Sequence, residues 1–315
     1  MQAMITATTV TGKTALFLGA ENGRSDVVLR LLEVMTMAGV PQTVNAICET
    51  TGATALSIAT SKGYTSTLQH LCNYTPHVDL DLPLHSGETP VFLACAANNL
   101  NKLKVLLDAK ADPNRSRHPP SHQHQHQHQH DNEFVDFEMT PLWSAVYHDQ
   151  LDCVRMLVNA DALPDQNPDR KWNGYTEGMI AALAGDFDTL NVLFKGRHPP
   201  SQTATNRDGE TIEYILQTVH QLTLEEAFDA DIYTQDVLPA DLRDKRAFAK
   251  LAKRTYDMCD VNGDGVMDYD EYREFFVEFG LKRAYGPKFQ DLLQLHFMRM
   301  DVNGQSVIEK RFEKL

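Results

Sequence analysis

Residues 260–271 place oxygen-bearing side chains at a spacing that suits a hard metal ion. Ca²⁺ binds about six to eight oxygen atoms, drawn from carboxylates, amide carbonyls, backbone carbonyls and water. In this segment three single-oxygen donors alternate at the start, and a backbone carbonyl and a water-bridging aspartate follow. A glutamate at the end can bind through both of its oxygens. The predicted ligands, in that order, are Asp260, Asn262, Asp264, Val266, Asp268 and Glu271.

The residues around these ligands fit the same interpretation. Gly265 stands at the sharp turn, where glycine adopts positive φ without a penalty from Cβ. Apolar residues recur at helical spacing over 242–258 and again over 270–281, so helix, loop and helix are all predicted. The segment resembles the EF-hand at every ligand position, and this resemblance implies a calcium site.

A second loop at 301–312 resembles the same motif but departs from it. Asp301, Asn303 and Glu309 keep oxygens at positions one, three and nine, whereas Phe312 replaces the closing glutamate. Loss of that residue removes two ligand oxygens and one charge. We interpret this loop as a structural partner of the first. Ile308 keeps the apolar side chain through which such loops pair in a short β-bridge, opposite Met267.

Internal repetition dominates the chain before residue 217. Five similar segments begin at Thr14, Thr54, Thr89, Thr140 and Thr176. Nine residues after these threonines stand Gly23, Gly63, Asn98, Asp149 and Gly185. Glycine, asparagine and aspartate tolerate the left-handed backbone that ends one helix and turns into another. Seventeen residues after them stand Leu31, Leu71, Leu106, Leu157 and Leu193. The leucines are predicted to stack between neighbouring outer helices.

These segments resemble the ankyrin repeat, most clearly in the sequences 89–94 (TPVFLA) and 140–145 (TPLWSA). The resemblance covers 11–217, with residues 209–216 as a truncated sixth unit or cap. It implies an inner helix, a turn, an outer helix and a hairpin-like loop in each unit, stacked into a solenoid. The signature histidine is replaced in every unit, and Gly178 weakens the predicted fifth inner helix.

An insertion at 117–135 separates the third and fourth units. It contains five histidines that alternate with glutamine between 121 and 130. Such a tract can bind zinc, nickel or copper. The alternative is a low-complexity expansion in an exposed loop, which costs little because long surface loops are tolerated. We favour the second interpretation.

Charge and cysteine content restrict the class of protein. The formal net charge is −14 and lies wholly in residues 1–240, because residues 241–315 hold equal numbers of basic and acidic side chains. An acidic surface argues against nucleic acid and anionic membranes as partners. No apolar run is long enough to span a membrane, and no signal peptide is evident. The cysteines lack a CxxC pair and fit buried thiols in a reducing compartment: Cys48, Cys72, Cys95, Cys153 and Cys259.

We therefore expect an all-α protein, with an ankyrin-repeat helical solenoid at 11–217, a connector at 218–240 and an EF-hand pair at 241–315. No catalytic motif is present, so we do not expect an enzyme. The leading hypothesis is a cytoplasmic calcium-binding adaptor that holds a protein partner on the concave face and loop tips of the solenoid. Candidate contacts are Tyr147, His148, Trp172 and Tyr175, each of which could equally pack between repeats.

Two alternatives stay open at the level of sequence. In the first, the chain is a static scaffold whose calcium ion is purely structural. In the second, it is a transition-metal binder that uses the His/Gln tract.

Overall fold

The computed structural model describes residues 6–117, 138–165, 172–228, 266–268, 273 and 307–309. The chain divides into two compact units, Met1–Gly178 with Asp188–Ser201, and Met179–Phe187 with Gln202–Leu315. In chain order, the described helices up to α11 are α2 (Ala15–Glu21), α3 (Ser25–Met37), η1 (Pro41–Asn45), α4 (Ala55–Lys62), α5 (Thr65–Cys72), α6 (Pro90–Ala96), α7 (Leu100–Asp108), α8 (Pro141–Tyr147), α9 (Leu151–Asn159), η3 (Trp172–Gly174), α10 (Glu177–Ala184) and α11 (Phe187–Lys195).

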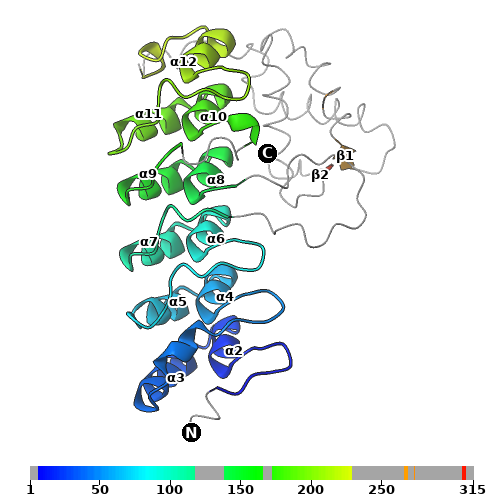
Figure 1. The fold of residues 1–315 in the computed structure, drawn as a ribbon, viewed down its shortest axis with the longest axis vertical. Coiled ribbons are helices and arrows are strands. Elements are labelled where there is room, and N and C mark those ends of the chain that lie inside the picture. Colours follow the sequence, from blue (N-terminus) through cyan, green and yellow to red (C-terminus); the bar gives the residue numbers. More distant parts are fainter. Residues whose placement is uncertain are drawn as a thin grey trace, which may run out of the picture. The chain divides into compact units, whose positions relative to one another are not determined.

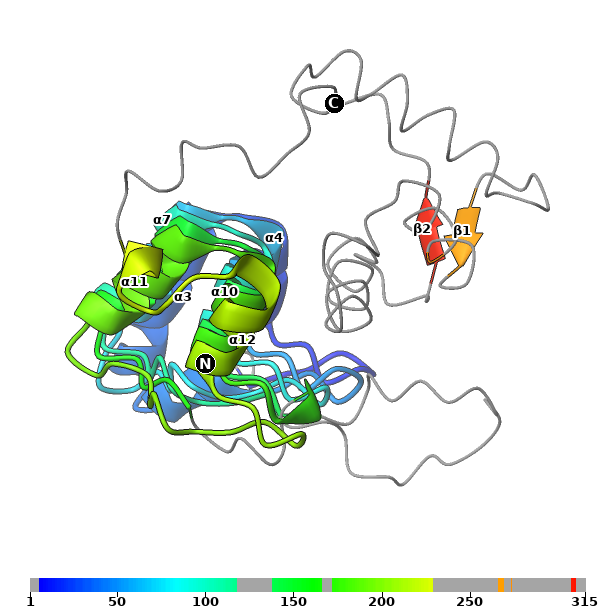
Figure 2. The same ribbon diagram turned by 90° about the horizontal axis from the view of Figure 1, so that it is seen from above.

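Helices of the first unit form two rows (Figure 1). The inner row contains α2, α4, α6 and α8, and the outer row contains α3, α5, α7 and α9. Consecutive members of each row pack against one another, and each inner helix packs against the outer helix that follows it. Seen along the array, the two rows lie side by side and the connecting loops run along one edge (Figure 2). This confirms the predicted succession of helix pairs.

Each inner helix begins at the threonine that the sequence singled out. The hydroxyls of Thr14, Thr54, Thr89 and Thr140 accept a hydrogen bond from the backbone N–H three residues later. A threonine at this position satisfies one of the amide groups that the first helical turn leaves without a partner. Ser57 completes a reciprocal pair at α4 by accepting from the N–H of Thr54.

The turn between inner and outer helix is left-handed in all five repeats. Gly23, Gly63, Asn98, Asp149 and Gly185 all have positive φ, between 47° and 91°. The predicted conformation is therefore confirmed. Gly23 illustrates the steric reason for a glycine, because an added Cβ would lie 2.5 Å from the Tyr64 ring.

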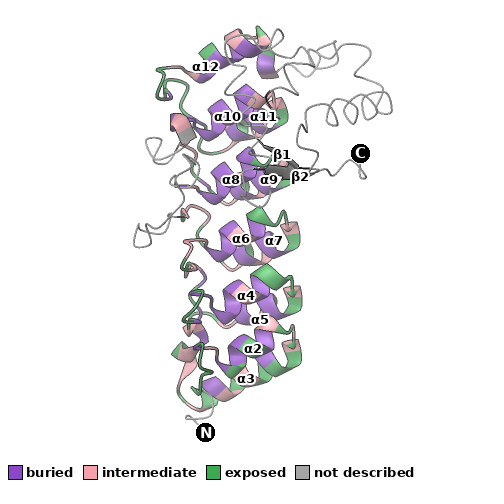
Figure 3. Ribbon diagram, turned by 90° about the vertical axis from the view of Figure 1, so that its right-hand side faces the viewer, coloured by how far each residue is buried: buried purple, intermediate pink, exposed green. Residues whose placement is uncertain are grey.

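The core lies between the two rows and between successive repeats (Figure 3). The residue fourteen positions after each threonine is fully buried in every repeat, namely Val28, Leu68, Leu103, Val154 and Leu190. The predicted stacking leucines are also buried in repeats two to five: Leu71, Leu106, Leu157 and Leu193. Leu31 differs, because it is only half-buried.

In the second unit, Thr211 caps a short helix, α12 (Ile212–Ile215), by accepting from the N–H of Tyr214. A single π-helical turn, η4 (Leu216–His220), follows and ends at Gln221 with φ 59°. The ring Nε2 of His220 makes a 2.8 Å hydrogen bond with the Ala182 carbonyl near the end of α10. The sequence analysis predicts a truncated sixth unit or cap in this segment. Within the predicted connector, residues Glu226–Phe228 form a 3₁₀ helix, η5, with Ala227 buried.

Two short strands complete the described part of the second unit. Strand β1 (Val266–Asp268) pairs antiparallel with β2 (Val307–Glu309). Met267 lies opposite Ile308, as the sequence predicts for the two loops. The predicted helices at 242–258 and 270–281 lie outside the described residues, apart from the single helical residue 273.

Candidate functional site

The inner helices of the first three repeats each carry a partly exposed apolar residue four positions after the repeat threonine. In α2 this residue is Leu18, with 38% of its surface exposed. The equivalent residues of α4 and α6, Ile58 and Leu93, are half-buried, and Ile58 also packs against a small core cluster that contains Phe17. We call the surface that carries these residues the inner-helix face. It is our candidate for the concave face on which the sequence analysis predicts a partner.

An ion pair lies at the α2 end of the inner-helix face. Lys13 Nζ lies 2.9 Å from Glu21 Oε1 and 5.2 Å from the centre of the Phe17 ring. Both members of the ion pair are about a quarter exposed, so the pair is screened and contributes little to stability. Its effect is to leave this end of the face without a strong net charge. An apolar partner surface therefore fits better than a highly charged one.

At the fourth repeat the inner helix no longer carries a partly exposed apolar residue. All seven residues of α8 are buried, including Tyr147. The Tyr147 ring stacks on Trp143 at a centroid distance of 5.0 Å, and Trp143 Nε1 donates to the Tyr175 carbonyl at 3.1 Å. Tyr147 and Tyr175 are thus packed within the array, which confirms the second of the two interpretations that the sequence left open for them.

Of the other two aromatic candidates, His148 is exposed. The side chain of Trp172 lies outside the described residues.

The ends of the His/Gln insertion are tied together. Arg117 and Met139 form an isolated antiparallel bridge, with Arg117 N donating to the Met139 carbonyl at 2.7 Å. Ser116 Oγ donates to the buried Glu138 carboxylate at 2.6 Å, and Arg117 Nε lies 3.3 Å from Glu88 Oε1. The tract of histidines lies outside the described residues, so the structure leaves both interpretations of it untested.

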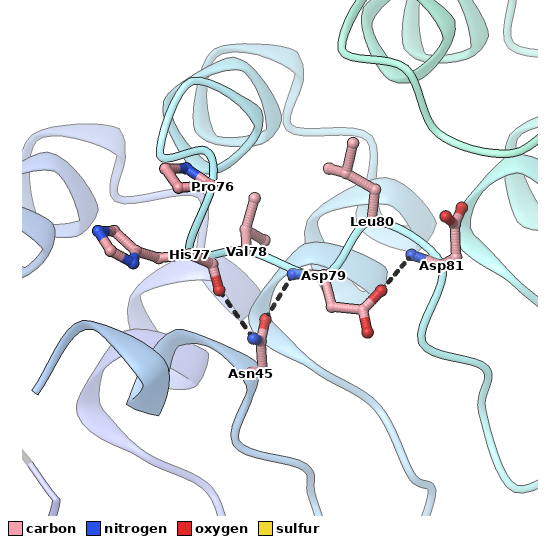
Figure 4. A pocket seen from close by; sticks show the side chains of 7 residues that line it. All are labelled: Asn45, Pro76, His77, Val78, Asp79, Leu80 and Asp81. Atoms are coloured by element: carbon pink, nitrogen blue, oxygen red, sulfur yellow. Dashed lines mark hydrogen bonds between the residues drawn. The ribbon is translucent and has the colours of Figure 1, made fainter.

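Aspartate and asparagine side chains link the loops that connect successive repeats. Asn45 accepts from Asp79 N and donates to the His77 carbonyl (Figure 4). Asp81 accepts from Asp112 N in the following repeat, and Asn114 accepts from Leu163 N one repeat further on. Each link satisfies a loop amide that has no helical partner, so the ladder holds successive repeats in register.

A shallow hollow of about 410 Å³ opens beside this ladder, lined by Asn45 and residues 76–81 (Figure 4). Partial burial raises the pKa of Asp81, and the neighbouring Asp112 and Asp79 carboxylates raise it further. The sequence analysis did not identify these residues. A signal was nevertheless present, because Asp79, Asn114 and Asp165 each stand 25 residues after a repeat threonine.

Four of the five cysteines are buried free thiols, as the sequence predicts: Cys48, Cys72, Cys95 and Cys153. Burial raises the pKa of the Cys72 thiol to about 12. A hydrogen bond with Cys153 and burial together raise the pKa of Cys95 well above its ordinary value. The Cys72 and Cys95 thiols therefore stay protonated at neutral pH. Cys259 lies outside the described residues.

The predicted calcium ligands fall mostly outside the described residues. Val266 and Asp268 belong to β1, whereas Asp260, Asn262, Asp264 and Glu271 are not described. Within the described ranges, no three histidine, cysteine or acidic side chains gather closely enough to hold a metal ion. In those same ranges no helix combines the length and the apolar character needed to cross a membrane.

Comparison with known proteins agrees with the helix pairs. The profile described as "Ankyrin repeats (3 copies)" matches residues 34–117, and the one described as "Ankyrin repeat" matches residues 137–168. These segments are ankyrin repeats. No curated protein matches the sequence. The ankyrin repeat is typically a non-enzymatic interaction module, so these repeats imply a protein partner.

Two solved structures are similar to the ankyrin array. An ankyrin repeat domain from Acinetobacter baumannii shares 20% identity over 60% of this chain and 84% of its own, with a TM-score of 0.44. The ankyrin repeat domain of Bcl-3, a member of the IκB family, shares 16% identity over 71% of this chain and 99% of its own, also with a TM-score of 0.44.

Proposed function

We propose that the chain is a calcium-binding adaptor whose ankyrin repeats hold a protein partner. The ankyrin array supplies the interaction module. Its inner-helix face at α2, α4 and α6 presents the partly exposed Leu18, Ile58 and Leu93, and the Lys13–Glu21 ion pair lies at the α2 end. A partner with an apolar contact surface suits this part of the array.

The calcium site is proposed for the loop at 260–271, with Asp260, Asn262, Asp264, Val266, Asp268 and Glu271 as ligands. The observation that supports it is the register of β1 and β2, in which Met267 faces Ile308. The two strands occupy the same positions, seven to nine, of the two predicted loops. The backbone of one loop therefore pairs with the backbone of the other in this stretch, which is the arrangement expected of a paired calcium-binding module.

Calorimetric titration of the full chain with Ca²⁺ tests the site. Glu271→Gln keeps the size of the side chain but removes the charge of the predicted bidentate ligand, so we expect the wild type to bind one ion and the variant to lose it. Glu309→Gln is the matched control, because it removes a charge from the second loop and should leave binding intact. A wild type that binds no Ca²⁺ at millimolar concentration would contradict the proposal.

The same titration separates a responsive adaptor from a static scaffold. Micromolar affinity with newly exposed apolar surface, detected by a hydrophobic dye, favours regulation by calcium. Submicromolar affinity without new apolar surface favours an ion that only maintains the fold.

A further inference from the structure

Two buried cysteines from neighbouring repeats contact one another through their side chains. Cys95 belongs to the inner helix α6 of the third repeat, and Cys153 to the outer helix α9 of the fourth. Their thiols share a hydrogen bond, and both residues are fully buried. The Cys153 thiol in turn donates to Asn98 Oδ1 at 3.4 Å, and Asn98 N donates to the Cys95 carbonyl at 2.8 Å. The two thiols and the Asn98 side chain therefore form one line of contacts.

The register of the repeats explains why these two residues meet. Cys95 stands six residues after its repeat threonine, and Cys153 stands thirteen residues after the next one. The same two positions meet one repeat earlier, where Lys102 Nζ donates to the Thr60 carbonyl. In both cases position thirteen of one repeat reaches position six of the repeat before it. The third and fourth repeats differ in that both positions carry sulfur.

The two thiols differ in their surroundings. Asn98, the partner of Cys153, is exposed in the turn after α6, so the Cys153 sulfur lies close beneath the surface. The hydrogen bond from Cys95 lowers the pKa of Cys153 and outweighs burial and the Asp152 carboxylate, which raise it. Thiolate is the reactive form of cysteine. Cys153 is therefore the nucleophile of the pair, and Cys95, whose pKa is raised, remains a thiol beside it.

We propose that Cys95 and Cys153 form a reversible disulfide bond between the third and fourth repeats when the protein is exposed to hydrogen peroxide. The Cys153 thiolate first attacks one peroxide oxygen and breaks the O–O bond. Cys153 becomes a sulfenic acid, and the departing hydroxide takes up the proton that the thiol released. The Cys95 sulfur then attacks the Cys153 sulfur, and the hydroxyl of the sulfenic acid leaves with the Cys95 proton as water. Two thiols and one peroxide thus give one disulfide and two water molecules.

The bond connects two repeats that otherwise only pack together. It closes a loop from 95 to 153 that contains the His/Gln insertion. Because α6 also carries Leu93 of the inner-helix face, oxidation fixes this helix against the fourth repeat. Thiols in a reducing compartment return to the reduced form, so the disulfide is transient there. Neither step involves calcium or a partner, and the inference is therefore independent of the proposed function.

Two other cysteines serve as internal standards. Burial raises the pKa of Cys72 to about 12, so this thiol should resist peroxide. A hydrogen bond with Thr50 lowers the pKa of Cys48, whose sulfur also contacts the Thr11 carbonyl. The Cys48 contacts are with oxygen atoms and not with a thiol, so its oxidation should stop at the sulfenic acid.

Peptide mapping of the full chain tests the inference. The protein is treated with hydrogen peroxide in the presence of a metal chelator, its remaining thiols are alkylated, and the unreduced digest is analysed by mass spectrometry. We expect a linked peptide pair that contains Cys95 and Cys153 and disappears after treatment with dithiothreitol, whereas Cys72 is recovered alkylated. The same chain oxidised in urea gives the level of random pairing. A folded wild type without this link, or with no more of it than in urea, overturns the inference.

Two variants test the assigned roles. Cys95→Ser keeps a hydroxyl donor for Cys153 but cannot form a disulfide, and Thr60 shows that a buried hydroxyl is accommodated at this position. Cys153→Thr copies the buried Thr67 of the second repeat. With dimedone present, Cys95→Ser should accumulate trapped sulfenic acid at Cys153, whereas Cys153→Thr should leave Cys95 unlabelled. Circular dichroism verifies that both variants fold. An unlabelled Cys153 in the first variant, or equal labelling of Cys95 in the second, overturns the roles.

Discussion

At the scale of single residues, Lys102 shows how a charge is accommodated inside the array. Its side chain is only 3% exposed, and its ammonium group donates to the Thr60 carbonyl near the end of α4. A cation suits this position because the end of a helix carries unsatisfied carbonyl groups and partial negative charge. We expect Lys102→Met to destabilise the protein by about 1–3 kcal/mol, because it leaves a buried carbonyl without a donor. Urea unfolding measures the loss.

Lys104 on the same helix is exposed and provides the control, since Lys104→Met should change stability little. The pH dependence gives a second check. Burial lowers the pKa of Lys102 from its ordinary value of 10.5, so the unfolded chain holds this proton more tightly than the folded chain. Stability conferred by Lys102 should therefore increase as pH rises through the window just below 10.5. A Lys102→Met variant with an unchanged alkaline profile would contradict this account.

At the scale of elements, the left-handed turn between the helices of each repeat sets the direction of the second helix. Gly63 has φ 91°, and an added Cβ would find only the Lys102 ammonium, 3.8 Å away. Backbone strain rather than crowding therefore limits this position. We expect Gly63→Asn to cost little, because Asn98 occupies the same position in the next repeat at φ 47°. Gly63→Val should cost roughly 1–2 kcal/mol, measured by urea unfolding.

Ser61→Val controls for a β-branched residue in α4, because Ser61 is an exposed helical position. Equal losses for Gly63→Val and Gly63→Asn would mean that lost glycine flexibility, and not the left-handed backbone, sets the cost.

The repeats could be predicted from sequence because three positions recur in each of them. The threonine caps, the left-handed turns and the buried leucines each report a local physical requirement that does not depend on the rest of the chain. Tyr147 and Tyr175 could not be assigned in this way. Their burial depends on how Trp143 fills the space between repeats, and a single sequence does not specify such packing.

The loop ladder was missed for a different reason. Its aspartates and asparagines resemble ordinary solvated loop residues, and only the repeat register reveals that Asp81 and Asn114 each bond to an amide of the following repeat. The calcium ligands remain a prediction from spacing, supported by the register of β1 and β2.

At the scale of the whole molecule, the question is whether calcium acts on the ankyrin array or only on the residues around the proposed site. The described repeats contain their own threonine caps, turns and buried leucines, so their stability does not require a bound ion. We expect calcium to slow hydrogen exchange at the backbone amides of β1 and β2 while leaving exchange in α4 and α6 unchanged. Mass spectrometry of the full chain with and without Ca²⁺ measures both, and Glu271→Gln should abolish the first effect.

If exchange in α4 or α6 also slowed, calcium would reshape the inner-helix face directly. Unchanged exchange there would mean that calcium reaches a partner through surfaces of the paired loops, and the array then provides a fixed platform for the partner.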